Sequence, residues 1–414
     1  MKHVIIGNGP AGVVAAEALR RSDSTADVVL LGDENEPPYS RMAIPYLLTG
    51  NIDEPGTYLR KDAGHYERLG IRLMHARAER VDSAARRVTL SSGKELPYDR
   101  LLIASGAHPL RPKIPGIDSP NVHPCWTLDD AREIAAKAKR GARVLQLGAG
   151  FIGCIVLQAL AERGVKLTVV EMGDRMVPRM MTPKAGDLIR RWVEKNGVQV
   201  HVNTRVEAIE AAGEAMRVKL SNGESCECDL LISAAGVSPN IAFLEGSGVK
   251  VSDGILVDER MQTSVPEIYA AGDVTEATGF HSGRPELNAI QPNAADQARI
   301  AAANMSGASA AMQGSLAINV LDTLGLVSSS FGQWQGVDDG DSVELVDEPH
   351  FRYLSLQFQD DVLIGATSIG WTDHVGALRG LIQGRVRLGS WKAKLLEDPT
   401  QFMAAYLAAA QKAA

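Results

Sequence analysis

The sequence predicts an α/β protein made of two parallel-sheet units, followed by a separate C-terminal α+β domain. A repeated pattern predicts the two units. An apolar strand-type run passes through three closely spaced glycines into a helical run, first within residues 4–19, where the helical run is rich in alanine, and again within 143–162. A change of pattern sets the last part aside, because short strand-type runs and helices replace this alternation after Gly314. The length of 414 residues accommodates two or three domains.

The first glycine motif follows the strand-type run Val4–Ile6. Each glycine meets a steric demand: Gly7 makes a tight turn, Gly9 lets the backbone approach a pyrophosphate, and Gly12 lets helix and strand pack closely. Pro10 suits the first helical turn, where its missing N–H would have no partner anyway. The helix N-terminus then presents free N–H groups to phosphates. Taken alone, this motif also fits a glycine turn that binds no ligand.

The same motif returns after the run Arg143–Leu147, with glycines at 148, 150 and 153. The next strand-type run ends in Glu171, eighteen positions past the third glycine, where the acidic residue of a dinucleotide site is expected. In the first unit, Asp33 and Glu34 follow the strand-type run Asp27–Leu31. A solvated turn is the alternative explanation for these two carboxylates. Two motifs with their acidic residues predict two Rossmann-like domains that bind two dinucleotides.

The composition is that of an ordinary globular chain, with 45% hydrophobic and 22% charged residues. A formal net charge of −7 argues against nucleic acid or an anionic membrane surface as the main partner. No apolar run approaches the roughly 20 residues that a membrane span needs. We expect no signal peptide, because Met1–His3 leads straight into the first strand. Four cysteines form no disulphide framework in a chain of this length, and a cytoplasmic location is expected.

The segments between and after the two motifs complete the expected organisation. Five prolines within 108–124 mark a crossover between domains, and a helix is expected over Leu128–Lys139. The segment Pro37–Tyr46 reads as an irregular loop, and Asn222–Gly223 as a hairpin turn. Further helices are expected over Lys184–Lys195, Asn293–Asn304, Asp373–Gln383 and Pro399–Lys412, and further strands over Ile71–His75, Arg87–Leu90, Tyr98–Ala107, Lys166–Val170, Val198–His201, Val206–Glu210, Asp229–Ala234, Arg352–Gln357 and Val362–Ser368.

Four stretches together resemble the FAD-dependent pyridine-nucleotide reductases. They are the two glycine motifs, the run Tyr98–Ala107, which is similar to that family's YDxLLIATGA with Ser105 for threonine, and the run Ile268–Asp273, which is similar to its IYAAGD. The resemblance covers effectively the whole chain. It implies FAD on the N-terminal motif and NADH on the internal motif. It also implies a FAD-binding domain over 1–110 and 240–313, a NAD-binding domain over 111–239, and a C-terminal interface domain over 314–414.

Within this family, the chain looks most like the NADH-oxidising flavin subunits of phenylglyoxylate dehydrogenase, tungsten aldehyde oxidoreductase and assimilatory nitrite reductase. The resemblance implies that Asp273 hydrogen-bonds the ribityl or pyrophosphate part of FAD. Glu171 is expected to hold the adenosine ribose of NADH and to repel a 2′-phosphate, a preference that Arg175 softens. No catalytic side chain and no metal site are assigned. The candidate cofactor-binding residues are Gly7, Gly9, Pro10, Ala11, Gly12, Asp33, Glu34, Arg41, Ala104, Ser105, Gly106, Gly148, Gly150, Phe151, Ile152, Gly153, Glu171, Ala235, Gly236, Gly272 and Asp273.

The departures from the family pattern bear on mechanism. Disulphide-reducing members carry a cysteine pair soon after the first motif, whereas this chain has no cysteine before Cys125. Other members carry a single redox cysteine where this chain has Met42, and a thioether forms neither a thiolate nor a mixed disulphide. Ile155 stands where the family often has a glutamate beside the nicotinamide. Disulphide reduction is therefore excluded, and structural roles are expected for Cys125, Cys154, Cys226 and Cys228.

Electrons taken from NADH must therefore pass through FAD to an acceptor outside the chain. The first hypothesis is an electron-transfer enzyme subunit that feeds an iron–sulphur protein or subunit. A flavin oxidase or quinone reductase with a small diffusible acceptor is the second. The third is a non-catalytic redox sensor that binds NADH and changes its oligomeric state. The C-terminal domain is expected to form a homodimer or to dock a partner, and Trp371 there either lines an electron exit or packs in the interface.

The purified protein should be yellow, with FAD held non-covalently, because the FAD motif set is complete and no residue for covalent attachment is evident. Heat or acid release of the flavin, followed by chromatography of the supernatant, measures this. Folded but colourless protein that takes up no added FAD would contradict the assignment.

Overall fold

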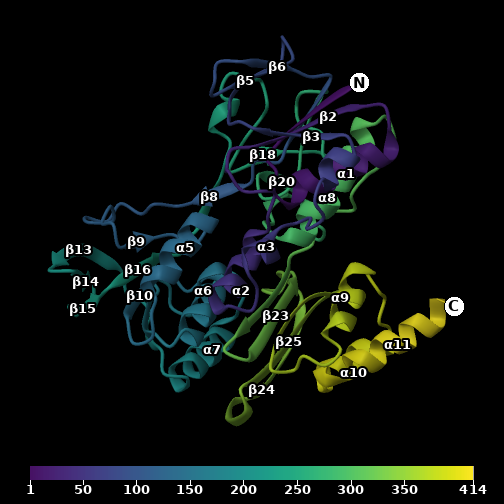
Figure 1. Ribbon diagram of the computed structural model, residues 1–414. Helices are drawn as coiled ribbons and strands as arrows, with labels where there is room; N and C mark the ends of the chain where they lie inside the picture. Colours follow the sequence, from purple (N-terminus) through teal and green to yellow (C-terminus); the bar gives the residue numbers. More distant parts are fainter. Residues whose placement is uncertain (414) are drawn as a thin grey trace. The chain divides into compact units, whose positions relative to one another are not determined.

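The computed structural model describes residues 1–413, which form two compact units, each assembled from segments that are far apart in the sequence (Figure 1). Both units contain a five-stranded parallel sheet, which confirms the predicted α/β class. Unit 1 comprises Met1–Ala43, Ile52–His108 and Val237–Leu316, and unit 2 comprises Ile44–Asn51, Pro109–Gly236 and Ala317–Ala414.

The central sheet of unit 1 contains β1 (Lys2–Ile6), β2 (Asp27–Gly32), β3 (Ile71–His75), β7 (Arg100–Ile103) and β19 (Ile268–Ala270). Their order across the sheet is β19–β7–β1–β2–β3, and all neighbours run parallel. Because β1 is the middle strand, the glycine turn at its carboxyl end lies beside the ends of β7 and β2. Parallel sheets of this kind bind ligands at the carboxyl ends of their strands.

The two faces of this sheet have different coverings. Helices α1 (Pro10–Ser22) and α8 (Gln291–Met305) pack on one face. On the other face lies an antiparallel meander of β4 (Ala78–Asp82), β5 (Arg87–Leu90) and β6 (Glu95–Pro97). Alternate strand residues point into these two cores, so the strands are apolar on both sides. Shorter elements are η1 (Arg41–Ala43), α3 (Glu54–Thr57), α4 (His65–Arg68), β8 (Ala107–Pro109), β17 (Val237–Pro239), η2 (Ala242–Leu244), β18 (Ile255–Leu256), β20 (Thr275–Thr278) and β21 (Pro285–Leu287).

Unit 2 repeats the arrangement with β9 (Val122–His123), β10 (Arg143–Leu147), β11 (Lys166–Val170), β12 (Gln199–His201) and β16 (Leu230–Ser233). The sheet order is β12–β11–β10–β16–β9, again parallel throughout, with β10 in the middle. The second glycine turn therefore occupies the same topological position as the first.

Helices and a second meander surround this sheet. The helices are α5 (Leu128–Lys137), α6 (Phe151–Glu162) and α7 (Pro183–Lys195). The meander of β13 (Val206–Ala212), β14 (Ala215–Leu220) and β15 (Ser225–Cys228) packs on one face of the sheet. Its predicted turn at Asn222–Gly223 is confirmed, with Gly223 at φ +87°.

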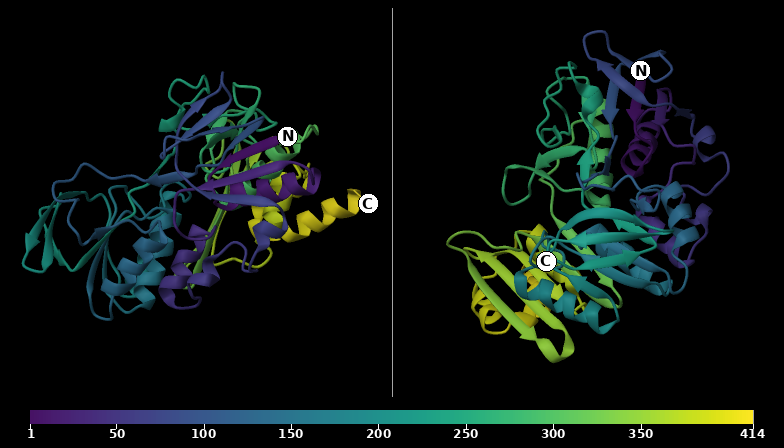
Figure 2. Two further views of the ribbon diagram at one scale, coloured as in Figure 1. Left: turned by 45° about the horizontal axis from the view of Figure 1, so that its top comes forward. Right: turned by 90° about the vertical axis from the view of Figure 1, so that its left-hand side faces the viewer.

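The C-terminal part of unit 2 is an α+β arrangement, as predicted. Its antiparallel sheet has the order β22–β23–β26–β25–β24, and Figure 2 shows the helices of this part gathered beside it. The elements are β22 (Ile318–Thr323), β23 (Leu326–Gly332), β24 (Asp341–Asp347), η3 (Glu348–His350), β25 (Arg352–Gln359), β26 (Val362–Ile369), α9 (Val375–Gln383), α10 (Ser390–Glu397), η4 (Pro399–Gln401) and α11 (Phe402–Ala413).

Side chains of α7 bind this C-terminal sheet to the rest of unit 2. The Trp192 indole N–H donates to the carbonyl oxygens of Thr323 and Leu324, each at 3.1 Å. Thr182, the N-cap of α7, donates its hydroxyl to Tyr353 Oη at 2.8 Å. That phenol donates in turn to Glu344 at 2.6 Å. Tyr353 is buried on β25 while Glu344 is exposed, so the hydrogen bonds of the phenol are partly shielded from water.

The predicted irregular loop at Pro37–Tyr46 is wrong from Arg41 onward. The 3₁₀ turn η1 and the helix α2 (Ile44–Thr49) occupy this segment. Pro45 lies in the first turn of α2, where a helix tolerates proline because that N–H has no intrahelical partner. Arg163 donates to the carbonyl oxygen of Leu48 in the last turn of α2 at 2.6 Å. Proline thus marks a helix start here rather than a loop.

No helix among residues 1–413 is long and apolar enough to cross a membrane.

Replacing Tyr353 with phenylalanine should lower the free energy of unfolding of unit 2 by about 1–3 kcal/mol, because Thr182 and Glu344 each lose a buried partner. Urea denaturation followed by tryptophan fluorescence measures the change. Tyr406→Phe is the matched control, because Tyr406 is exposed on α11. Equal midpoints for the two variants would contradict a stabilising role of the buried phenol.

Candidate functional site

The first glycine turn joins β1 to α1 under tight steric limits. Gly7 has φ +106°, and a Cβ there would lie 2.1 Å from the carbonyl oxygen of Ala104 at the end of β7. A Cβ at Gly12 would lie 1.9 Å from the carbonyl oxygen of Gly7. At Gly9, by contrast, no described atom other than those of its chain neighbours lies within 4 Å of the Cβ position. The first and third glycines are thus required by contacts within the chain, while the second faces open space in which a ligand fits.

The second turn repeats each of these features. Gly148 has φ +99°, and its Cβ would lie 2.4 Å from the carbonyl oxygen of Ala234, just past β16. A Cβ at Gly153 would lie 2.6 Å from the carbonyl oxygen of Gly148. Around Gly150 the described residues again leave the Cβ position free to 4 Å. Two cradles of the same shape therefore exist in one chain.

The helices that follow the turns begin without a side-chain cap. Gly9 and Gly150 are the N-cap residues of α1 and α6, and no described side chain accepts a hydrogen bond there. Thr127 caps α5, and Thr182 caps α7. First-turn N–H groups need an acceptor, and an anion at a helix N-terminus supplies one. Among the helices beside the parallel sheet of unit 2, the contrast with α5 and α7 therefore favours a phosphate ligand at α6, and the same geometry recurs at α1.

The residues around the two cradles include most of the predicted set. Pro10 and Ala11 form the first turn of α1, and Phe151 and Ile152 form that of α6. Ala235 and Gly236 continue the segment past β16 that contacts Gly148.

Glu171 at the end of β11 is a buried carboxylate, 8% exposed. One of its oxygens accepts the N–H of Ala149 in the glycine turn at 2.7 Å, and the other accepts the N–H of Gly173 at 2.7 Å. A carboxylate has further lone pairs for ribose hydroxyls, and its charge disfavours a 2′-phosphate nearby. The position therefore suits the predicted ribose contact.

Arg175 is not available to a 2′-phosphate in this arrangement. Its guanidinium donates to the carbonyl oxygens of Met181 (2.9 Å) and Pro178 (3.2 Å) and pairs with Asp174 at 2.7 Å. The expected softening of NADH preference by Arg175 is therefore not supported.

The acidic residues of unit 1 are placed differently. Gly7 donates its N–H to Leu31, as Gly148 does to Val170, so Gly32 and not an acid occupies the position equivalent to Glu171. Asp33 next to it is exposed. Glu34 pairs with Arg41 at 2.5 Å and accepts the phenol of Tyr39 at 2.5 Å. The structure thus brings Glu34 and Arg41 together, while Asp33 stays at the surface.

Two amide side chains that the sequence did not single out hold the predicted loops of unit 1. Asn240 donates its side-chain amide to the carbonyl oxygen of Ser105 at 2.8 Å, and its backbone bonds both Ser105 Oγ and Gly106. Gln297 on α8 accepts the N–H of Gly272 at 2.8 Å. Both contacts join segments far apart in the sequence, so no local pattern could have identified them.

Asp273 follows Gly272 at the carboxyl end of the unit 1 sheet. Burial raises the pKa of its carboxyl group, and the positive charge of Arg41 opposes that rise. A poorly solvated carboxyl group gains from hydroxyl donors, which agrees with the predicted contact to a ribityl or pyrophosphate group.

This chain has no redox cysteine at the position where members of the family carry one. Met42 lies in η1 with an exposed side chain. The cysteines that the structure describes are all free. Burial raises the pKa of the Cys125 thiol and of the Cys154 thiol, each to about 12, which keeps both protonated at neutral pH. Cys154 is a fully buried packing residue of α6, as expected.

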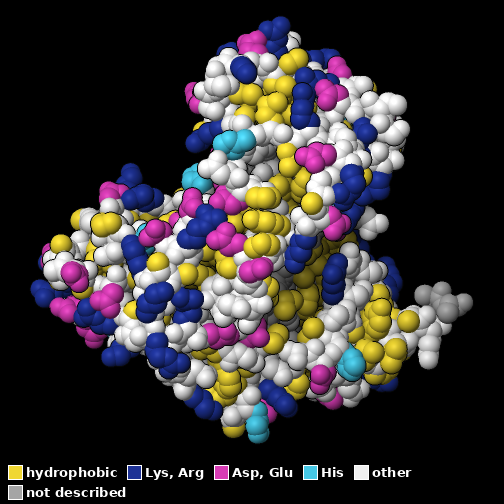
Figure 3. All heavy atoms as spheres, viewed as in Figure 1, with side chains coloured by type: hydrophobic (Ala, Val, Ile, Leu, Met, Phe, Trp, Pro, Cys, Tyr) yellow, Lys and Arg dark blue, Asp and Glu magenta, His cyan; other side chains and the backbone are white. Residues whose placement is uncertain are grey.

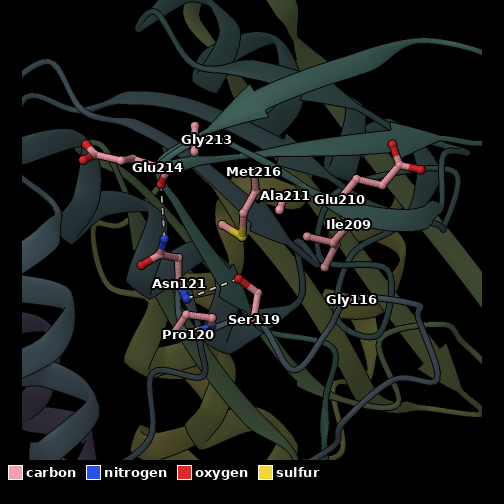
Figure 4. A pocket seen from close by; sticks show the side chains of 11 residues that line it. Gly116, Ser119, Pro120, Asn121, Ile209, Glu210, Ala211, Gly213, Glu214 and Met216 are labelled. Atoms are coloured by element: carbon pink, nitrogen blue, oxygen red, sulfur yellow. Dashed lines mark hydrogen bonds between the residues drawn. The ribbon is translucent and has the colours of Figure 1, made fainter.

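A shallow cavity of about 370 Å³ lies beside β13 and β14 and shares no lining residue with the candidate cofactor sites. Figure 4 shows the carboxylates of Glu210 and Glu214 pointing away from Met216 at its centre. Its two charged lining residues, Glu210 and Glu214, direct their carboxylates away from its centre, so the cavity is not assigned to the chemistry.

Residues 1–302 match the family model of the pyridine nucleotide-disulphide oxidoreductases. The chain belongs to this family, whose fold and paired cradles it shares, and it is an oxidoreductase that uses FAD and NAD(H).

Individual relatives refine the comparison. The chain is 30% identical to the NADH-dependent phenylglyoxylate dehydrogenase subunit epsilon of Aromatoleum evansii, over 96% of this chain and 95% of that protein. It is 34% identical to the ferredoxin–NAD(+) reductase component of the anthranilate 1,2-dioxygenase system of Burkholderia cepacia, over 74% and 75%. Among solved structures, the NAD-dependent persulfide reductase from A. fulgidus superposes with a TM-score of 0.87 at 27% identity, over 94% of this chain and 78% of that one.

The ratio of kcat/KM for NADH to that for NADPH should exceed one and should fall about tenfold or more in Glu171→Ala, because a carboxylate that repels the 2′-phosphate is lost. Steady-state kinetics with both donors measures the ratio. A general loosening of the turn would lower kcat/KM for both donors alike and so would leave their ratio unchanged. Glu162→Ala, an exposed acid at the end of α6, is the control. An unchanged ratio in Glu171→Ala would refute the assignment.

Proposed function

We propose that this chain is a FAD-containing NADH:acceptor oxidoreductase that passes electrons from NADH to an external iron–sulphur protein or partner subunit. The observation that carries the proposal is the pair of open glycine cradles at uncapped helix N-termini, one in each unit. Two dinucleotide cradles in one chain fit a reaction between two dinucleotides better than a single bound cofactor with a separate substrate.

The residues of unit 1 would hold FAD. Gly7, Gly9 and Gly12 leave room for its pyrophosphate at the N-terminus of α1. Glu34, fixed by Arg41 and Tyr39, would meet the adenosine ribose. The Ser105 loop and Asp273, which Asn240 and Gln297 steady, would line the remainder.

The residues of unit 2 would hold NADH in the same manner. Gly148, Gly150 and Gly153 leave room for the pyrophosphate, and Glu171 orients the ribose. When both are bound, the nicotinamide supplies a hydride and the flavin accepts it and passes electrons onward. The protein contributes position, because two bound reactants react far faster than two diffusing ones.

Neither Met42 nor the thiols of Cys125 and Cys154 can take electrons onward from the flavin. Met42 cannot form a disulphide, and the thiols of Cys125 and Cys154 stay protonated. An acceptor outside the chain is therefore required. A relative that is a subunit of a dehydrogenase and another that is a ferredoxin–NAD(+) reductase component both support a protein acceptor.

The surface of the C-terminal part is the proposed place for a partner, whether a redox protein or a second copy of the chain. Tyr406 and Leu407 on α11 are exposed, and Figure 3 shows apolar side chains gathered near this end of the chain. On the same face, acidic and basic side chains are interspersed, which supports a protein rather than a nucleic acid as partner. We propose a cytoplasmic location.

Reduced protein should reoxidise slowly in air and much faster with a one-electron acceptor, because the proposed partner is an iron–sulphur protein. Stopped-flow absorbance, after reduction with one equivalent of NADH, measures both rates. A ferredoxin and a one-electron dye serve as acceptors, and a two-electron quinone serves as the comparison. Reoxidation in air as fast as with any of these acceptors would favour the oxidase hypothesis instead. Binding of NADH without turnover on any acceptor would favour the redox sensor.

A further inference from the structure

The two glycine turns have the same backbone course but different supports. In both, the first glycine donates its N–H to the strand that precedes the acidic segment, Gly7 to Leu31 at 2.9 Å and Gly148 to Val170 at 2.8 Å. In both, the second glycine faces open space. The equivalence is close enough for residues to be compared one by one.

The residue beneath the turn differs in kind. Ile5 on β1 and Gln146 on β10 stand two positions before the first glycine, and both are 0% exposed. Gln146 donates its side-chain amide N–H to the carbonyl oxygen of Gly148 at 2.8 Å. Its side-chain oxygen is buried and has no hydrogen-bond partner among the described residues. Packing alone does not explain this choice, because isoleucine fills the same position in unit 1.

The next residue of the unit 2 turn, Ala149, is also held through both of its backbone polar groups. Ala149 donates its N–H to Glu171 at 2.7 Å, and its carbonyl oxygen accepts the N–H of Val177 at 2.8 Å. Val177 is buried with φ +50°, a left-handed conformation that a β-branched residue rarely adopts. Backbone strain of this kind persists only where the surroundings enforce it, and it concentrates at functional sites.

The unit 1 turn lacks these supports. Asn8 takes the place of Ala149, and the structure places no described side-chain acceptor on its N–H. Its own side chain fills the space beside Gly32 instead, where a Cβ would lie 2.2 Å from the Asn8 amide nitrogen. The supporting hydrogen bonds are thus specific to unit 2: a side-chain amide and a strained backbone N–H donate two of them, and a carboxylate accepts the third.

We propose that Gln146 is a positioning residue for the nicotinamide dinucleotide: by holding the Gly148 carbonyl, it fixes the peptide groups of the turn in the orientation that meets the pyrophosphate. This rests on the proposed function, which places NADH at this turn. NADH binds and leaves in every catalytic cycle, whereas FAD remains bound. A turn fixed in advance lowers the ordering cost of each binding event. The buried unpaired oxygen is a cost that a function at the turn would offset.

The test replaces Gln146 with methionine, which keeps length and volume but removes the donor, and separately with isoleucine, the residue that unit 1 carries at this position. Calorimetric titration of the FAD-loaded protein with NAD⁺ gives a Kd without turnover. We expect the Kd for NAD⁺ and the KM for NADH to rise about threefold to tenfold in both variants, as the loss of one hydrogen bond implies. The kcat and the FAD content of both variants should equal those of the wild type within error. The melting temperature should be unchanged or higher.

Gln158→Met makes the same chemical change on the outer side of α6 and should leave every quantity unchanged. An unchanged Kd in both Gln146 variants would overturn the proposal while leaving the proposed function intact. A parallel fall of kcat, FAD content and melting temperature would also overturn it, because that result describes a general structural role. If the wild-type, FAD-loaded protein binds no NAD⁺, the proposed function itself fails, and this inference fails with it.

Discussion

Steric exclusion at the two glycine turns is the constraint on which the rest of the structure depends. A Cβ at Gly12 or Gly153 would overlap the carbonyl oxygen of the first glycine of its own turn. The first turn of each helix therefore lies so close to the backbone of the glycine turn that only a residue without a side chain fits there. This close approach lets each helix pack against the strand that precedes it. The N-termini of α1 and α6 are consequently directed to the carboxyl ends of their sheets, which is where a dinucleotide fits. The cradles are a product of backbone packing before any ligand-binding side chain is considered.

A site made largely of backbone gives its side chains an indirect part. Asn240 and Gln297 bond peptide groups of the loops in unit 1, and Gln146 does so in unit 2. Carboxylates contribute in both ways: Glu171 bonds the turn and keeps lone pairs for a ligand. The chemistry of the cofactors needs little beyond position, and residues that hold peptide groups are the ones that set position.

The sequence predicted what is local and missed what is not. Glycine spacing and apolar periodicity predicted β11 and the last residue of α6 correctly, since both are buried elements with sharp ends. The strands β22 and β24 went unpredicted, because each is a half-buried edge of its sheet with a weak alternation. The contacts of Asn240 with Ser105 span 135 positions in the sequence, and no property of either residue alone predicts them.

Sequence spacing alone also could not identify which residue of unit 1 is equivalent to Glu171 of unit 2. Counting from the third glycine placed Asp33 and Glu34 near the expected position, yet the backbone hydrogen bonds of the two turns make Gly32 the equivalent of Glu171. The carboxylate of Glu34 is held by an ion pair with Arg41 and by a hydrogen bond from Tyr39. Both residues lie in the segment that was predicted to be an irregular loop. A one-residue offset in a turn changes which side chain meets a ligand, and register is decided by the whole sheet.

The attachment of the C-terminal sheet bears on how the acceptor is chosen. Trp192 and Tyr353 bind that sheet to the portion of unit 2 that carries the second cradle. Hydrogen bonds of a buried phenol and of an indole to two carbonyl groups leave little freedom for one to move against the other. A partner that docks on the sheet or on α11 is therefore held in a fixed relation to the proposed NADH site. Since the cradles carry no information about the acceptor, the docking surface proposed on this C-terminal part would have to select it by shape and charge.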